Sequence, residues 1–128
     1  MQHFTSGWID WNLALDEMGG PNWAKNNVDA PIIINSTAKE YYKQPMFYAL
    51  GHFSRFLSPE SQRIGTTDEG SDHLQTVVFQ TPDNATVLIV INRHDESIPM
   101  SVIDPDANGI LRTNVPSHSF QSYVWRIK

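Results

Sequence analysis

The first quarter of the chain combines indole rings with amide and carboxylate groups. The strings Trp8-Ile9-Asp10-Trp11-Asn12 and Gly19-Gly20-Pro21-Asn22-Trp23 hold three of the four tryptophans of the chain. An indole offers a flat apolar face, and Asn and Asp side chains hydrogen-bond polar groups, so this composition suits a pocket that stacks on a ligand and bonds its rim. Sugars are such ligands. The alternative interpretation is that these tryptophans are core residues with ordinary polar neighbours.

Other kinds of chemistry have weaker support. The segment 104–109 begins like an EF-hand calcium loop, but its twelfth position is Val115 instead of Glu, and an Asn-Gly turn between strands explains it better. The histidines show no metal-ligand spacing, and no phosphate loop or Ser-His-Asp arrangement is present, so we expect neither a metal nor a cofactor. Five glutamates are predicted to be solvated surface residues, namely Glu17, Glu40, Glu60, Glu69 and Glu96.

Length and charge exclude several classes of protein. The chain has 128 residues and a formal charge of −5 without a Lys/Arg cluster, which argues against nucleic acid as a partner. A complete (β/α)8 barrel needs about 250 residues, so a whole barrel enzyme is excluded. The longest apolar run, residues 87–91, is far below the ~18 residues of a membrane-spanning helix. No signal peptide opens the chain, which indicates truncation, while sequons at Asn35 and Asn84 favour the secretory route.

The hydrophobic pattern predicts the elements that position these residues. Residues 5–12 and 31–34 are typical of strands. From Pro45 the period becomes helical, with apolar residues at Met46, Leu50, Phe53 and Leu57, and Ser58-Pro59 ends the helix. After Glu60 the pattern is all-β and predicts a β-sandwich with strands over residues 73–80, 86–92, 98–103 and 119–126.

Five strings carry a family resemblance that covers nearly the whole chain. They are GWIDWNLAL, GGPNWAKNNVDAPII, YYKQPMFYALGHFSRFLSPESQRIG, TVLIVINR and YVWRIK, in that order from Gly7 to Lys128. Together they resemble the carboxy-terminal part of the lysosomal acid glucosylceramidases, family 30 of the glycoside hydrolases.

The resemblance implies a fold of α/β plus all-β class. It comprises the last strand-helix unit of a (β/α)8 TIM barrel followed by most of a carboxy-terminal β-sandwich. The implied boundaries are 1–12 for the last barrel strand, 13–44 for a loop with a small antiparallel sheet, 45–59 for the last barrel helix, and 60–128 for the sandwich. The family's sandwich also takes strands from the extreme amino terminus, so we expect this one to be incomplete.

The resemblance also implies a retaining β-glucosidase that hydrolyses glucosylceramide to glucose and ceramide. The family's two catalytic glutamates lie on barrel strands that precede this chain, so we expect no catalytic residue here and no activity of the chain alone. Trp11 and Asn26 match substrate-binding residues of the glucose subsite, and their types suit ring packing and hydrogen bonding to hydroxyls. Asp10, Asn12, Trp8 and Trp23 have weaker claims. Asn27 departs from the phenylalanine of vertebrate members, which makes ceramide preference less certain than glucoside hydrolysis.

The implied surroundings are the lysosomal lumen, reached through the secretory pathway, with peripheral contact to a lipid membrane and an activator protein as a further partner. Two alternatives stay open. One is a non-catalytic truncated product with a structural or binding role. The other is a family 30 glycosidase with a different aglycone preference.

Overall fold

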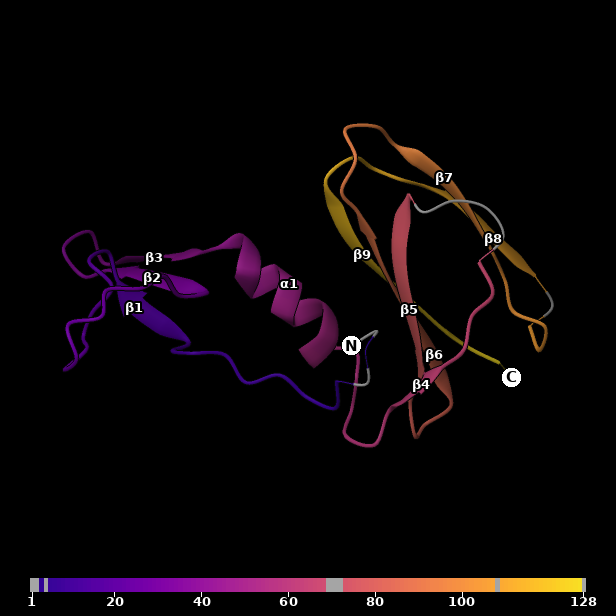
Figure 1. Cartoon of the computed structure of the whole chain (residues 1–128), viewed down its shortest axis with the longest axis horizontal. Helices are drawn as coiled ribbons and strands as arrows, with labels where there is room; N and C mark the ends of the chain where they lie inside the picture. Colours follow the sequence, from indigo (N-terminus) through magenta and orange to yellow (C-terminus); the bar gives the residue numbers. More distant parts are fainter. Residues whose placement is uncertain (1–2, 4, 69–72, 108, 128) are drawn as a thin grey trace. The chain divides into compact units, whose positions relative to one another are not determined.

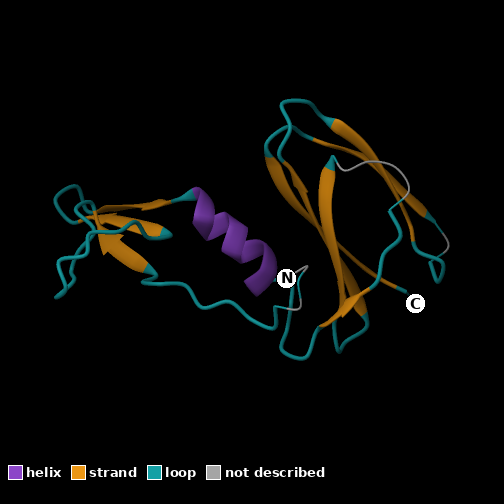
Figure 2. Cartoon of the chain, viewed as in Figure 1, coloured by secondary structure: helices purple, strands orange, loops and turns teal. Residues whose placement is uncertain are grey.

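The computed structural model describes residues 3, 5–68, 73–107 and 109–127, and its chain separates into two compact units, 1–51 and 52–128 (Figure 1). The first unit holds three short strands and most of the only helix in the described ranges, and the second consists mainly of strands (Figure 2).

The sheet of the first unit has the order β1-β2-β3, formed by Ala14–Asp16, Ile32–Asn35 and Glu40–Lys43. Strands β2 and β3 are antiparallel, but β1 runs parallel to β2. The expected antiparallel pairing is therefore present between β2 and β3, whereas the parallel pairing of β1 differs from the expectation. The segment between β1 and β2, residues 17–31, is long enough for the crossover that a parallel pair needs.

The strand predicted at residues 1–12 is not formed in the part that the structure describes. Residues 5–10 pair with no other segment, and Ile9 is 98% exposed. A strand requires a hydrogen-bonded neighbour, and the residues described here include no further barrel strand to supply one. The first ladder begins two residues later, at Ala14.

Helix α1 spans Pro45–Ser54, starting where predicted but ending earlier than residue 59. One further helical bond, from the Leu57 N–H to the Phe53 carbonyl at 3.0 Å, precedes Ser58-Pro59. No residue of α1 is fully buried, and the apolar residues that defined the helical period are half-buried, namely Met46, Leu50, Phe53 and Leu57.

The predicted β-sandwich is confirmed in the second unit. One sheet has the order β4-β5-β6-β9, from Gln62–Ile64, Leu74–Gln80, Ala85–Asn92 and Ser119–Arg126, and the other pairs β7 (Ile98–Ile103) with β8 (Ile110–Val115). Four of these strands agree with the prediction to within one residue. Strands β4 and β8 were not predicted.

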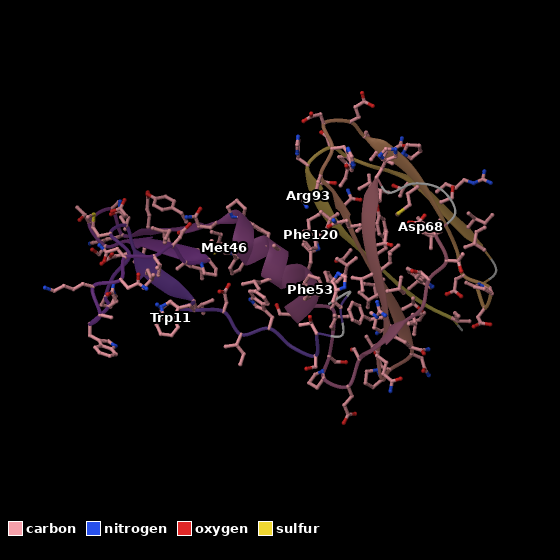
Figure 3. The ribbon with its side chains drawn as sticks, viewed as in Figure 1. Trp11, Met46, Phe53, Asp68, Arg93 and Phe120 are labelled. Atoms are coloured by element: carbon pink, nitrogen blue, oxygen red, sulfur yellow. The ribbon has the colours of Figure 1, made fainter. Side chains whose placement is uncertain are left out.

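The core of the sandwich lies around β6, which pairs with both β5 and β9. Val78, Leu88 and Val90 of the larger sheet pack with Val115 of β8, and Met100 and Val102 of β7 lie against this cluster. The residues that alternate with them along β6, Val87 and Ile89, are also buried. On that second face His52 stacks on Phe120 at 4.5 Å between ring centroids, and Phe53 meets Phe120 edge-on at 6.1 Å (Figure 3).

A buried amide ties the sandwich loops together. Asn92 is 1% exposed, and its side-chain nitrogen donates to the carbonyls of Glu96, Val115 and Pro116 at 2.8, 3.0 and 2.9 Å. Its oxygen accepts from the His94 N–H at 2.9 Å. Two amide hydrogens thus serve three carbonyls, so at least one hydrogen is shared.

Candidate functional site

The first unit contains an open pocket of about 660 Å³ that brings the two predicted substrate-binding residues together. Trp11 and Asn26 both line it, Trp11 from the segment before β1 in the chain and Asn26 from the segment after β1. Trp11 is 70% exposed, and its side chain is drawn in Figure 3 together with that of Met46. The complete lining is Asp10, Trp11, Asn26, Val28, Asp29 and Met46.

Trp11 is held by hydrogen bonds on both of its flanks. The Asp10 carboxylate accepts from the Trp11 backbone N–H at 2.9 Å. Asn12 takes a left-handed backbone conformation with φ of 45°, which asparagine tolerates better than most residues. The Leu13 carbonyl then accepts from the Ile32 N–H at 3.2 Å and joins the segment to β2. The Asp10 carboxylate therefore fixes the backbone at Trp11, and Asn12 makes the turn that follows it.

Asn26 is positioned by the side chain of Asn22. The Asn22 amide oxygen accepts from the Asn26 backbone N–H at 2.8 Å, and its nitrogen donates to the Gly19 carbonyl at 2.8 Å. The same nitrogen lies 3.3 Å from the Asn27 amide oxygen. One side chain thus connects the beginning of the loop to the residues at the pocket.

The base of this loop leaves room only for glycine at position 19. Gly19 has φ of +77°, and a Cβ there would lie 2.8 Å from the Val28 carbonyl oxygen and 3.1 Å from the Asn27 Cα. The Asp16 carboxylate accepts from the N–H groups of Met18 and Gly20 at 2.9 and 2.7 Å. The two ends of the loop therefore touch each other directly, and this contact places the Asn27–Val28 backbone beside the pocket.

Asp29 and Met46 are pocket residues that sequence reasoning missed. The Asp29 carboxylate accepts from the Ala30 N–H at 2.8 Å and from the Gln44 side-chain amide at 3.0 Å. Met46 was predicted only as part of the apolar period of the helix, but it is half-buried and lines the pocket. The only feature of the sequence that could have pointed to Asp29 as a pocket residue is its position directly before the Ala-Pro that leads into β2.

Of the four weaker candidates, Asp10 lines the pocket, whereas Asn12, Trp8 and Trp23 do not. Trp8 and Trp23 lie outside its lining, and Trp23 is 97% exposed. Asn27, the departure from the vertebrate phenylalanine, is exposed and contacts Asn22. The pocket therefore offers one aromatic face, one amide and two carboxylates that already bind backbone N–H groups. Such a set can pack against a ring and exchange hydrogen bonds with hydroxyls.

The remaining candidates have other partners. Among the described residues, no three His, Cys, Asp or Glu side chains gather as a metal site. The Asp104 carboxylate of the EF-hand-like segment accepts from the Trp125 indole N–H at 2.8 Å and from the Asp106 N–H at 3.1 Å. Asn108 of the predicted turn and Glu69 lie outside the described residues.

Two family models together match almost the whole chain. The glycosyl hydrolase family 30 TIM-barrel domain matches residues 1–57, and the glycosyl hydrolase family 30 beta sandwich domain matches residues 60–123. The pocket residues all lie within the first match. The two models agree with the predicted fold class, the end of a barrel followed by a sandwich.

A named relative and two solved structures also match most of the chain. The chain is 47% identical over 124 residues to lysosomal acid glucosylceramidase of Mus musculus, covering 97% of this chain and 24% of the mouse protein. The crystal structure of SrfJ from Salmonella typhimurium matches with a TM-score of 0.87 and 30% identity, over 96% of this chain and 27% of SrfJ. The endo-beta1,6-glucanase BT3312 matches with a TM-score of 0.79 and 27% identity, over 91% of this chain and 26% of that enzyme.

Proposed function

Because the chain belongs to glycosyl hydrolase family 30, we propose that the full-length protein hydrolyses the β-glucosidic bond of glucosylceramide, releasing glucose and ceramide. The observation that carries this proposal is the pocket in which Trp11 and Asn26 meet. It lies within the residues matched by the barrel model, in a chain 47% identical to a protein named lysosomal acid glucosylceramidase. The family resemblance that the sequence carried is confirmed by these matches.

This chain would supply a wall of the glucose subsite. A retaining glycosidase uses two carboxyls about 5–5.5 Å apart, one as nucleophile and one as acid/base. We assign both to parts of the protein outside this chain, which spans 24% of the mouse relative. Trp11 would pack on the CH face of the glucosyl ring while Asn26 bonds a hydroxyl. Asp10 and Asp29 would hold the backbone beside them, since each carboxylate already accepts a backbone N–H.

We further propose that the protein works in the lysosomal lumen at a membrane surface, with an activator protein as a partner. The name of the mouse relative supports the location. Trp23 and Met18, 97% and 76% exposed on the loop between β1 and β2, support contact with lipid, because indole rings favour the membrane interface. None of the helices described is long and apolar enough to span a membrane.

The test uses the full-length protein with a fluorogenic β-glucoside and with glucosylceramide at acidic pH. We expect Trp11→Ala to lower kcat/KM by ~2–4 kcal/mol, through lost ring packing at the cleavage subsite. Asn26→Ala should cost ~1–3 kcal/mol, the value of one hydrogen bond to a buried polar partner. Phe53→Ala is the control, because this ring lies against Phe120 and outside the pocket lining, and it should lower stability by ~3–5 kcal/mol while leaving KM nearly unchanged.

Three results would contradict the proposal. If Trp11→Ala keeps its kcat/KM and lowers only the melting temperature, Trp11 is a packing residue. If the protein cleaves oligosaccharides in preference to glucosylceramide, the different aglycone preference is correct. The name of the endo-beta1,6-glucanase match is the observation that favours this second candidate. A stable full-length protein that cleaves neither substrate would support the non-catalytic role.

A further inference from the structure

The turn between β5 and β6 presents Asn84 to solvent. Residues 82–84 are exposed, whereas the chain is buried at Thr81 before them and at Ala85 after them. Asn84 has φ of 59°, in the left-handed region that asparagine accepts at turns. It is also the first residue of the sequon Asn84-Ala85-Thr86.

The turn is held together without the Asn84 side chain. The Thr81 hydroxyl oxygen accepts from the Ala85 N–H at 2.9 Å, and the Thr81 carbonyl accepts from the Asn84 N–H at 3.0 Å. Asp83 accepts from the Thr81 hydroxyl and from Arg126, both at 2.5 Å. Within the described ranges no group hydrogen-bonds the Asn84 side-chain amide. A group attached to that nitrogen therefore breaks no contact of the folded turn.

The second sequon, at Asn35, differs in this respect. The Asn35 side-chain nitrogen donates to the Glu17 carboxylate at 3.0 Å, and its oxygen accepts from the Ala38 N–H at 2.8 Å. Asn35 is also half-buried at the end of β2. A sugar on its nitrogen would lie against Glu17, so chains modified at Asn35 should fold less readily and be fewer among the secreted copies.

We propose that Asn84 is an N-glycosylation site of this protein, which rests on the lumenal location proposed above. The donor would be an oligosaccharide linked to a lipid pyrophosphate. The Asn84 amide nitrogen bonds to the anomeric carbon of the first sugar, the bond from that carbon to the phosphate oxygen breaks, and the lipid pyrophosphate leaves as the amide loses one proton.

The position of Thr86 sets the order of events. Thr86, which supplies the hydroxyl of the sequon, is buried in β6 opposite Gln80 of β5 and Trp125 of β9. An enzyme that reads this hydroxyl can reach it only before the hairpin closes. Transfer therefore precedes completion of the sandwich, and the finished turn then holds the glycan in solvent.

The experiment measures glycan occupancy at both sequons of the full-length protein. The protein is secreted from mammalian cells behind a signal sequence, and its tryptic peptides are treated with peptide N-glycosidase in ¹⁸O-labelled water, which marks each formerly glycosylated Asn as labelled Asp. We expect most copies to be labelled at Asn84 and fewer at Asn35. Asn84→Asp, which keeps a side chain suited to a left-handed turn, should remove one glycan from the intact mass. Asn35→Asp is the matched control, and it should remove less glycan mass than Asn84→Asp does.

Each outcome has one meaning. An unlabelled Asn84, or occupancy at Asn35 above that at Asn84, overturns the proposal. The protein is also expressed with its own amino terminus. If Asn84 is glycosylated only when the signal sequence is added, the result supports the site and contradicts the lumenal location. Glucosidase activity is assayed on the same material, so an active enzyme without a glycan at Asn84 overturns this inference alone, and a glycosylated but inactive protein overturns only the hydrolase.

Discussion

Replacing Asn22 by alanine tests whether this side chain sets the position of Asn26. The change removes two good hydrogen bonds, to the Gly19 carbonyl and from the Asn26 N–H at 2.8 Å each, and a weaker contact to Asn27 at 3.3 Å. A hydrogen bond contributes about 0.5–1.5 kcal/mol net, so losing the two good ones makes ordering this loop harder by about 1–3 kcal/mol. Substrate binding then has to supply that ordering, and kcat/KM of the full-length enzyme should fall about 5- to 160-fold.

The assay is a double-mutant cycle with the fluorogenic β-glucoside. If Asn22 acts by placing Asn26, its removal should cost little in an Asn26→Ala background, where the amide to be placed is already absent. The two losses should therefore be non-additive, as expected for residues that act through one contact. Asn27→Ala is the matched control in the same loop, because it removes only the 3.3 Å contact, and its effect should stay within about twofold.

Additive losses in the cycle would show that Asn22 and Asn26 act independently and would refute the positioning role. The role would also be refuted if Asn22→Ala kept kcat/KM within twofold of wild type. A third outcome, a melting temperature lowered as much as by Phe53→Ala, would identify Asn22 as a general determinant of stability instead.

Two further predictions concern the sandwich. Asn92→Ala should lower the free energy of unfolding by about 3 kcal/mol or more, because three buried or partly buried carbonyls lose their donor, and thermal melts of the full-length protein should reveal it. Burial lowers the pKa of His52 in the folded protein below its usual range, so the unfolded chain binds more protons. The free energy of unfolding should therefore fall as the pH drops through about 6.5, the pKa of an unperturbed histidine, and should level off below the pKa of the folded state. Comparing melting temperatures between pH 5 and 8 with those of His52→Phe, which keeps a ring on Phe120, checks this, and a constant difference between the two proteins would contradict it.

The sequence predicted the sandwich well because its strands carry a local signal. Residues 85–92 are rich in β-branched side chains between turn residues, and that pattern is sufficient to place β6. The segment 5–12 contains aromatic and β-branched residues that are compatible with a strand, but it pairs with nothing in the described chain. A β-type sequence pattern shows that a segment can join a sheet, but the segment forms a strand only when another strand pairs with it.

The site was predicted only in part for a similar reason. Trp11 and Asn26 were found by family resemblance, and the structure brings them to one pocket. The roles of Asn22 and Asp29 depend on how the loop closes and on which backbone groups it brings near them. Asn22 stands in a Gly-Gly-Pro-Asn string that predicts a loop, but such a string does not specify the partners of the amide.

The parallel pairing of β1 with β2 allows the two sides of the pocket to change independently during evolution. Trp11 precedes β1, and Asn26 lies in the crossover that ends at β2, so the ladder fixes the ends of the crossover whatever its length. Doubling a flexible loop adds only about 0.6 kcal/mol of closure entropy. Insertions or deletions in the crossover can therefore remodel the Asn26 wall while the Trp11 wall is inherited unchanged. A lineage could in this way alter which ligands fit without rebuilding the sheet.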